Sequence, residues 1–454
     1  MKKKLSFRET ISITSMLFGM FFGAGNLIFP ALMGQLSGRN VWIAIIGFCV
    51  TAVGMPLLGV AALGISQSDG LQSLSGKVGR GYSYFFTCAL YLSIGPFFAI
   101  PRCATVPFTI GIEPLLGEGA SASTALLIFT LVFFALVLVF SLFPNGIMTW
   151  IGRILNPIFL VLLGVLVVRA LIDPMGAIES IEPSGNYVTG AFFTGFIEGY
   201  GTMDALAALA FGIVVVDVIK RLGVSEPNAI ARNTAGAGIF SCLLMGLIYL
   251  AVTIVGTQSR ALYDVCDNGG EVLALIAKHY FGTAGDIVMA AIVTFACLKT
   301  AIGLITSCSE AFEKMFKKGP SYRVWAIIFC IVSLLIANQG LTAIISYSLP
   351  VLYLLYPLAI TLILLALFGN LFRHSRTIYA WVTGLTLFAA IIDFFAALPA
   401  NVTAALHLDV VVSAVRSVLP FSSIGLGWVC PALLGLIIGM IIYTTKGENK
   451  KAAA

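Results

Sequence analysis

Two stretches of this sequence place glycines and polar residues inside long apolar segments. The first runs from Phe21 to Pro30 and contains Gly-Ala-Gly-Asn, and the second runs from Glu198 to Asp204 and contains Gly-Tyr-Gly-Thr. Each unsatisfied backbone group costs several kcal/mol in hydrocarbon, so unwound backbone is expected only where it lines a cavity. Backbone N–H groups that begin a half-helix suit a carboxylate, and carbonyls that end one suit an amine or a small cation. We therefore predict a binding site at these interruptions; the alternative for the first is close helix packing through small residues.

Glu198 and Asp204 are acids within an apolar segment. Ionisable groups there cost roughly 2.5–3.5 kcal/mol on insertion scales, and they usually pair or take part in transport. On an intact helix, residues six apart point about 120° away from each other. A break at Gly199 or Gly201 changes that relation. Either acid can then touch a cation or a substrate, and one of them can instead be the structural partner of Arg102.

Arg102 lies in another apolar segment and follows two prolines, Pro96 and Pro101. The prolines are expected to kink this helix. A guanidinium inside the membrane must find an acid or backbone carbonyls. We interpret Arg102 as one member of a coupling or structural ion pair, with Glu198 among the candidate partners.

A later segment carries polar residues at spacings of three to four, which places them on roughly one helix face. They are Lys299, Thr300, Gly303, Thr306 and Ser307. Hydroxyl oxygens there suit Na⁺, although they can instead bond to carbonyls of the preceding turn. Lys299 is the exception, because a buried lysine changes its protonation state readily and can itself occupy a cation site.

The composition defines the class of protein that must position these residues. Of 454 residues, 59% are hydrophobic and only 10% are charged, whereas soluble domains carry about 25% charged residues. A bilayer core needs about 20 apolar residues per helix. We therefore predict an all-α polytopic membrane protein with twelve transmembrane helices. The expected segments are 10–33, 41–64, 82–110, 123–143, 151–171, 189–217, 236–256, 285–311, 323–337, 342–368, 378–398 and 420–444.

The basic residues follow this topology. With the N-terminus placed inside, 19 of the 26 lysines and arginines fall on the inner side, as the positive-inside rule requires. We therefore expect a multi-pass protein of the cytoplasmic membrane with both termini cytoplasmic. The positive net charge then reflects topology, and no nucleic-acid partner is implied. The lipid bilayer is the expected surrounding, and no protein partner is indicated.

The first ten of the twelve helices divide into two halves of five. We expect a single transmembrane domain over 1–454, with a first repeat at 1–175, a second and inverted repeat at 186–370, and two peripheral helices with a tail at 371–454. An odd number of helices per half inverts the second half, and the two interruptions then fall in helices 1 and 6. Between helices 7 and 8, the stretch from Glu271 to Tyr280 is expected to form a short amphipathic helix that either caps a vestibule or lies on the surface.

Four motifs, in this order, resemble those of the bacterial branched-chain amino acid:cation symporters. They are Phe22-Gly-Ala-Gly-Asn-Leu-Ile-Phe-Pro30, Gly95-Pro-Phe-Phe-Ala-Ile-Pro-Arg102, Gly199-Tyr-Gly-Thr-Met-Asp204 and Ala296-Cys-Leu-Lys-Thr-Ala-Ile-Gly-Leu304. The likeness extends over essentially the whole chain. It implies the leucine-transporter fold, with a 5+5 inverted repeat and discontinuous helices 1 and 6, and alternating access to the site.

The resemblance also implies roles for individual residues. The substrate-binding group would be Phe21, Gly23, Ala24, Gly25, Tyr200, Thr202, Asp204 and Leu304. Asn26 and Thr202 would supply oxygens to one sodium site beside the substrate. The second sodium site would be formed by carbonyls of Gly19, Phe22 and Ala296 together with the side chains of Lys299 and Thr300.

Lys299 departs from the sodium-coupled relatives of this fold, which typically offer a small hydroxyl at that position. An ammonium there would repel or replace Na⁺. We expect a symporter that imports leucine, isoleucine and valine, with Na⁺ as the coupling ion; the alternatives are proton coupling through Lys299 or a helix 6 acid, and a sensor that binds amino acids without transporting them. No enzyme is predicted, because no nucleophile–base or metal constellation is found, and no cofactor or metal beyond Na⁺ is expected.

Overall fold

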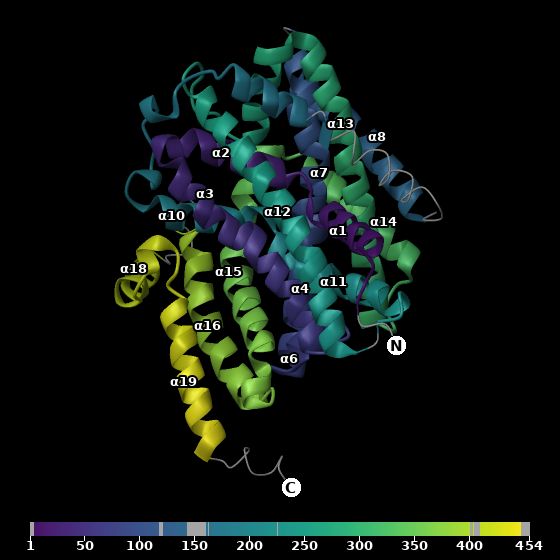
Figure 1. The fold of residues 1–454 in the computed structure, drawn as a ribbon, viewed down its shortest axis with the longest axis vertical. Helices are drawn as coiled ribbons and strands as arrows, with labels where there is room; N and C mark the ends of the chain where they lie inside the picture. Colours follow the sequence, from purple (N-terminus) through teal and green to yellow (C-terminus); the bar gives the residue numbers. More distant parts are fainter. Residues whose placement is uncertain are drawn as a thin grey trace.

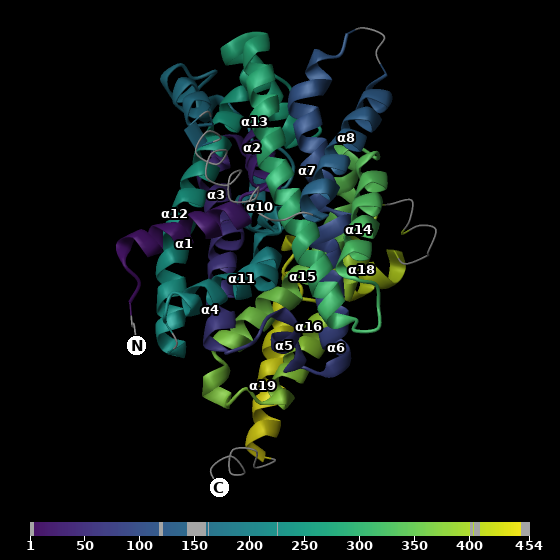
Figure 2. The ribbon, with the colours of Figure 1, turned by 90° about the vertical axis from the view of Figure 1, so that its right-hand side faces the viewer.

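The computed structural model describes residues 4–117, 121–142, 160–161, 163–224, 226–399, 403 and 409–445. Across these ranges the chain is a bundle of helices joined by short connections, and none of the described residues forms a β-strand. Figures 1 and 2 show the bundle elongated along one axis, with the C-terminal end at its lower tip and the first part of α13 near the opposite tip.

Every expected membrane segment contains a helix, and several are divided by kinks. The first half of the chain holds α1 (Phe7–Phe21), α2 (Gly25–Ser37), α3 (Val41–Cys49), α4 (Met55–Ile65), α5 (Leu71–Gly76), α6 (Arg80–Leu92), α7 (Ala99–Pro107) and α8 (Ala122–Leu142). For the segment expected at 151–171, the described part is an apolar helix from Leu163 to Ile172. Residues 143–159 lie outside the described residues.

The second half begins with the other interrupted helix. It holds α10 (Tyr187–Glu198), α11 (Asp204–Arg221), α12 (Pro227–Ser259), α13 (Gly269–Met315), α14 (Tyr322–Ala337), α15 (Leu341–Leu367), α16 (Arg376–Ala396), α18 (Asp409–Val418) and α19 (Val429–Thr445). The amphipathic helix expected from Glu271 to Tyr280 is confirmed as the first part of α13, which bends at Gly282, where φ is +57°.

Helices far apart in the sequence pack together and enclose the interruptions. We number the twelve expected membrane segments as spans 1 to 12 in chain order: span 1 holds α1 and α2, span 6 holds α10 and α11, span 8 lies in α13 and span 10 is α15. The second half-helix of span 1, α2, packs against α12 and α13. Helix α10 packs against α3, and α16 packs against α15 and α19. Figures 1 and 2 both show α1 lying across the long axis of the bundle. Both halves of span 1, α1 and α2, lie against α12, and both also contact α13.

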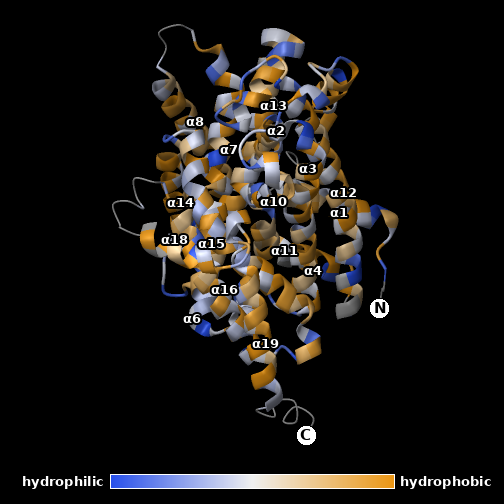
Figure 3. Cartoon of the chain, turned by 90° about the vertical axis from the view of Figure 1, so that its left-hand side faces the viewer, coloured by the Kyte–Doolittle hydropathy of each residue, from blue (hydrophilic) through white to orange (hydrophobic). Residues whose placement is uncertain are grey.

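The surface of the bundle has the apolar character of a membrane protein. Seven described helical stretches are long and apolar enough to cross a bilayer, and three shorter apolar helices accompany them. Large side chains such as Leu247, Leu335 and Ile437 are more than half exposed. Figure 3 shows hydrophobic residues (orange) along most of the helices. In a bilayer these exposed side chains meet lipid, which removes the cost of leaving them in water.

Candidate substrate and cation site

The interruption of the first span is confirmed. Helix α1 ends at Phe21, Phe22 is extended, and α2 begins at Gly25. The side chain of Asn26 folds back over the gap, and its Oδ1 accepts a 2.7 Å hydrogen bond from the N–H of Gly23. The amide thus replaces a helical bond that the unwound segment has lost. This bond also engages one of the N–H groups expected to hold a carboxylate.

The second interruption is also confirmed, and it is a tight turn. Helix α10 ends at Glu198, the residues Gly199–Thr202 form a 3₁₀ turn, and α11 begins at Asp204. Met203 joins them in the left-handed region, with φ +63° and ψ +12°, a conformation that costs a residue with a side chain about 1–2 kcal/mol. The hydroxyl of Thr202 donates to the carbonyl of Gly199 at 3.0 Å.

The two interruptions lie against each other because glycines face across the gap. A Cβ on Gly25 would stand 3.3 Å from the carbonyl oxygen of Gly201 and 3.4 Å from the Cα of Thr202. A Cβ on Gly201 would stand 2.4–2.6 Å from ring atoms of Phe29 in α2. Larger residues at either position would push the broken segments apart.

Three polar side chains meet where the broken spans touch. The Asn26 amide donates to Asp204 Oδ2 at 2.6 Å and also to the hydroxyl of Tyr249, and that hydroxyl donates to the same carboxylate oxygen at 2.9 Å. All three residues are at most 1% exposed. Hydrogen bonds to a charged group contribute about 1.5–3 kcal/mol each. This cluster therefore ties α2, α11 and α12 together around one buried acid.

Arg102 is fully buried and contacts both broken spans, without an ion pair among the described residues. Its Nη1 donates to the carbonyl of Gly201 at 2.8 Å, and its guanidinium lies 5.4 Å from the ring centre of Phe29. The expected ion pair of Arg102 with an acid is thus replaced by a carbonyl that the turn in span 6 exposes. Arg102 is positioned to hold the two interruptions in register.

Replacing Arg102 tests whether it holds the two interruptions together. Lysine keeps the charge but lacks the planar guanidinium that both donates to a carbonyl and lies over an aromatic ring. We expect Arg102→Lys to lower the free energy of unfolding by about 1.5–3 kcal/mol and Arg102→Ala to lower it further, since hydrogen bonds to charged groups contribute about 1.5–3 kcal/mol. Thermal unfolding of the purified variants in detergent measures both. A wild-type unfolding midpoint for the alanine variant would contradict the assignment.

The second expected cation site brings span 8 to the first interruption. A Cβ on Gly23 would stand 3.4 Å from the methyl group of Thr300, so the unwound segment and α13 are in contact. The hydroxyl of Thr300 donates to the carbonyl of Ala296 at 3.1 Å. That back-bond is the alternative role expected for hydroxyls on this face. Lys299, the residue directly before Thr300, is partly buried.

The remaining expected site residues surround these contacts. Phe21, Ala24 and Leu304 are buried, and Gly19 and Phe22 lie at or near the end of α1. Tyr200 is directed to span 10, where its ring stacks on Tyr356 with centroids 4.1 Å apart. Glu198 is displaced from the cluster, since it lines a separate cavity between α10 and α15. Of the two span 6 acids, only Asp204 lies at the junction.

A cavity of about 430 Å³ opens on the side of the bundle toward the C-terminal end of α13. It is bounded by α6, α11, α13 and the start of α5. Its lining includes Thr87, Tyr91, Phe211, Ser307 and Glu310. Ser307 lies about two turns beyond Thr300 on the same helix, and none of the residues at the junction of the broken spans lines this cavity.

Tyr249 was missed by reasoning from the sequence. It lies in an apolar helix, where an aromatic residue is normally a packing residue, and its edge-on contact with Phe48 is of that kind. The one available signal is that a buried tyrosine hydroxyl usually has a polar partner. Nothing in the sequence indicates that this partner is Asp204, 45 residues away.

The fold and the paired interruptions define a polytopic membrane protein of the leucine-transporter fold class. A solved structure of Mhp1, titled as its inward-facing conformation, matches with a TM-score of 0.63 and 15% identity over 96% of this chain and 91% of that chain. Mhp1 in a closed conformation with bromovinylhydantoin, described as a nucleobase-cation-symport-1 family transporter, matches with a TM-score of 0.58 and 16% identity over 97% of this chain and 93% of that chain.

Residues 6–446 match the family model described as branched-chain amino acid transport protein. The chain is 52% identical to the branched-chain amino acid permease BrnQ of Lactobacillus delbrueckii subsp. lactis over the full length of both, and 44% identical to BrnQ of Bacillus subtilis over 98% of this chain and all of that one. The protein belongs to this family of transport proteins. The expected family is thereby confirmed, as is the expectation that the protein is not an enzyme.

Proposed function

We propose that this protein imports leucine, isoleucine and valine together with a cation, by alternating access across the cytoplasmic membrane. Family membership supports the substrate class, because the relatives are named as branched-chain amino acid permeases. The contact between the two broken spans supports the location of the site. Cation entry would provide about 2.3 kcal/mol per charge for each 100 mV of membrane potential, in addition to any concentration gradient.

The observation that carries the proposal is the buried cluster of Asn26, Asp204 and Tyr249 at the junction. The Asp204 carboxylate links the two broken spans to a third helix. A cation or an ammonium that binds this carboxylate would therefore change how the three helices pack. The backbone of Gly23, Ala24 and Gly25 would meet the substrate carboxylate. Its aliphatic side chain needs an apolar pocket, in which one methylene is worth only about 1–3 kcal/mol, so selectivity among the three substrates would be modest.

We propose Na⁺ as the coupling ion and assign two sites for it. The first would use oxygens of Asn26 and Thr202 beside the substrate. The second would use Gly19, Phe22, Ala296 and Thr300, where Gly23 lies against the Thr300 side chain. The hydroxyls of Thr202 and Thr300 each donate their proton to a carbonyl, which leaves the oxygen lone pairs available to coordinate Na⁺.

Proton coupling is the second candidate, and two observations favour it. Lys299 directly precedes Thr300 of the second cation site. Asp204 is a buried acid at the junction that accepts a hydrogen bond from Asn26. A proton moving on and off either group would change the charge there without the need for a coordination shell. A sensor without transport stays an alternative to both.

The deciding experiment is uptake of radiolabelled leucine into proteoliposomes with inward Na⁺ and H⁺ gradients imposed separately. We expect accumulation driven by Na⁺. Accumulation driven by H⁺ alone would overturn sodium coupling and support Lys299 or Asp204 as the coupling group. Binding of leucine without accumulation under either gradient would favour a sensor.

Lys299 gives a specific test of the coupling ion. Replacing it with Thr restores the small hydroxyl typical of sodium-coupled relatives and removes the ammonium that would repel Na⁺. We expect Lys299→Thr to lower the Na⁺ concentration needed for half-maximal uptake by about tenfold, since one charge at about 4 Å contributes 1–4 kcal/mol. An unchanged dependence on both ions would show that this lysine does not control coupling. Lys278→Thr, a lysine near the start of α13, is the matched control.

A further inference from the structure

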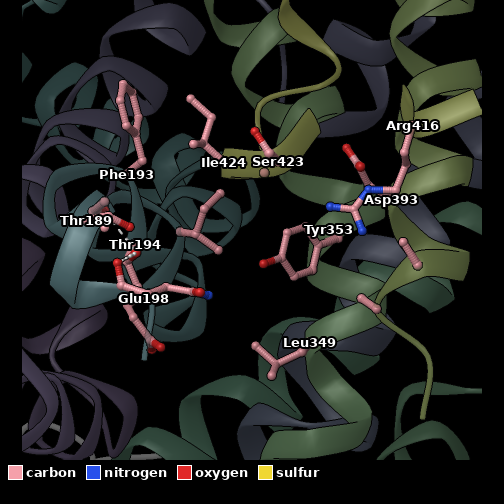
Figure 4. A pocket seen from close by; sticks show the side chains of 16 residues that line it. Thr189, Phe193, Thr194, Glu198, Leu349, Tyr353, Asp393, Arg416, Ser423 and Ile424 are labelled. Atoms are coloured by element: carbon pink, nitrogen blue, oxygen red, sulfur yellow. Dashed lines mark hydrogen bonds between the residues drawn. The ribbon is translucent and has the colours of Figure 1, made fainter. Parts of the chain in front are cut away.

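A separate cavity of about 430 Å³ lies next to the interruption of span 6, and its walls carry both acidic and basic side chains (Figure 4). It is formed by α10, α15, α16, α18 and the turn Ser422–Ile424. Its size falls within the range of about 300–1,000 Å³ that small-molecule sites occupy. None of the three residues of the buried cluster lines it.

The charged lining consists of Glu198 from α10, Asp393 from α16 and Arg416 from α18. Arg416 is fixed by its neighbour, because Nε donates to the Ser422 hydroxyl at 3.0 Å and Nη2 donates to the Ser422 carbonyl at 2.9 Å. Figure 4 shows its guanidinium directed toward the middle of the cavity, with Glu198 on the opposite wall and Tyr353 between them. Arg416 and Glu198 thus lie on opposite walls of the cavity, with the Tyr353 ring between them.

Asp393 supplies the strongest sign that something binds here. Its side chain is only 4% exposed, and its Oδ2 is buried without a hydrogen-bond partner among the described residues. None of the ion pairs found in the described part of the chain includes Asp393, Glu198 or Arg416. Burying a carboxylate without a partner is costly. A donor that enters the cavity would remove that cost once the Asp393 side chain turns Oδ2 toward it.

We propose that this cavity binds a small zwitterion that carries a primary ammonium and an oxyanion. The oxyanion would meet Arg416, and the ammonium would meet Asp393, which Figure 4 shows beside Arg416. The aliphatic part would contact the apolar wall formed by Phe193, Ile197, Leu349 and Ile424. This chemistry is found in a free amino acid and in the headgroup of an aminophospholipid, and the experiment below separates these two sources.

Occupancy of this cavity would bear on the interruption of span 6. Glu198 is the last residue of α10, directly before the turn Gly199–Thr202. Tyr353 lies edge-on to Tyr200 of that turn, with ring centres 6.3 Å apart. A ligand held by Arg416, with its aliphatic part against Phe193 and Ile197 of α10, would restrain α10 relative to α18. The cavity is thus a second site, distinct from the site of the proposed function.

Binding to a variant with a blocked junction tests the proposal independently of transport. Binding of radiolabelled leucine to purified Gly25→Leu protein is measured by equilibrium dialysis. Two double variants, Gly25→Leu with Arg416→Gln and Gly25→Leu with Asp393→Asn, are measured in the same way. We expect saturable binding to Gly25→Leu that weakens at least tenfold in both combinations, because hydrogen bonds to charged groups are lost. Arg39→Gln, which removes an exposed arginine paired with Glu182 elsewhere, is the control and should change nothing.

The lipid source is tested on the wild-type protein in parallel. Thermal unfolding is followed in micelles with phosphatidylethanolamine or with phosphatidylcholine, whose quaternary ammonium cannot donate hydrogen bonds. A midpoint raised by phosphatidylethanolamine alone, in wild type and not in Asp393→Asn, identifies the headgroup as the occupant. Failure of both leucine and phosphatidylethanolamine to bind overturns the proposal. Because Gly25→Leu needs only to fold, not to transport, a failed uptake experiment leaves this result interpretable.

Discussion

Replacing Asp204 with Asn is expected to abolish gradient-driven accumulation of leucine. The Asp204 carboxylate accepts hydrogen bonds from Asn26 and Tyr249 at the junction of three helices. Asparagine keeps the shape but removes the charge that would attract a cation, and it weakens two hydrogen bonds worth about 1.5–3 kcal/mol each. A loss of about 3 kcal/mol corresponds to a fall of at least about a hundredfold in the uptake rate. The measurement is initial uptake into proteoliposomes with an imposed ion gradient.

Tyr249→Phe is the matched control, because it removes one donor to the carboxylate and leaves the charge. We expect its uptake to fall only about tenfold. Glu198→Gln removes the other acid of span 6, which lies outside the cluster, and it should leave the coupling ion unchanged. Accumulation by Asp204→Asn at the wild-type rate would show that the buried carboxylate takes no part in coupling.

Replacing Gly25 with Leu should eliminate uptake while the protein still inserts into the membrane. Even a Cβ at this position would stand 3.3 Å from the carbonyl of Gly201, so the rest of a leucine side chain has no space unless the two interruptions separate. Overpacking of this kind costs about 1–3 kcal/mol or more. Separation would also displace the backbone groups proposed to bind the substrate. Leucine uptake in cells, normalised to protein in the membrane, measures the effect.

The two glycines of the junction should differ in their tolerance of alanine. A methyl group at Gly25 meets its neighbours at 3.3–3.5 Å, which a small shift relieves, whereas a methyl group at Gly201 meets the Phe29 ring at 2.4–2.6 Å. We therefore expect Gly25→Ala to retain a measurable rate and Gly201→Ala to retain much less. The reverse order, or near-normal uptake by Gly25→Leu, would refute this placement of the site.

The sequence was sufficient to predict the two interruptions. Gly-Ala-Gly-Asn and Gly-Tyr-Gly-Thr weaken a helix through its own local backbone preferences, and the apolar residues around them require a membrane. Both breaks occur within the residues expected, at Phe22–Ala24 and Gly199–Met203. The helix within the loop between spans 7 and 8 was predicted for the same reason, because its amphipathic pattern is local.

The partners of the buried polar residues could not be predicted in this way. A buried Arg102 requires either an acid or a carbonyl as its partner. In the structure this partner is the Gly201 carbonyl, because the turn in span 6 directs that carbonyl toward Arg102. Asp204 and Glu198 looked equivalent in the sequence. The left-handed residue Met203 turns the chain between them, so Asp204 enters the junction while Glu198 faces a different cavity.

The sequence alone determined the class of protein, the approximate positions of the described helices and the two places where helices break, because these depend on apolar length and on residues close together in the chain. Only the tertiary structure determined that Asn26, Asp204 and Tyr249 share one hydrogen-bonded cluster, and that Glu198, Asp393 and Arg416 surround a second cavity. Both groups join helices from distant parts of the chain. Their contacts depend on how whole helices pack, and no local pattern encodes that packing.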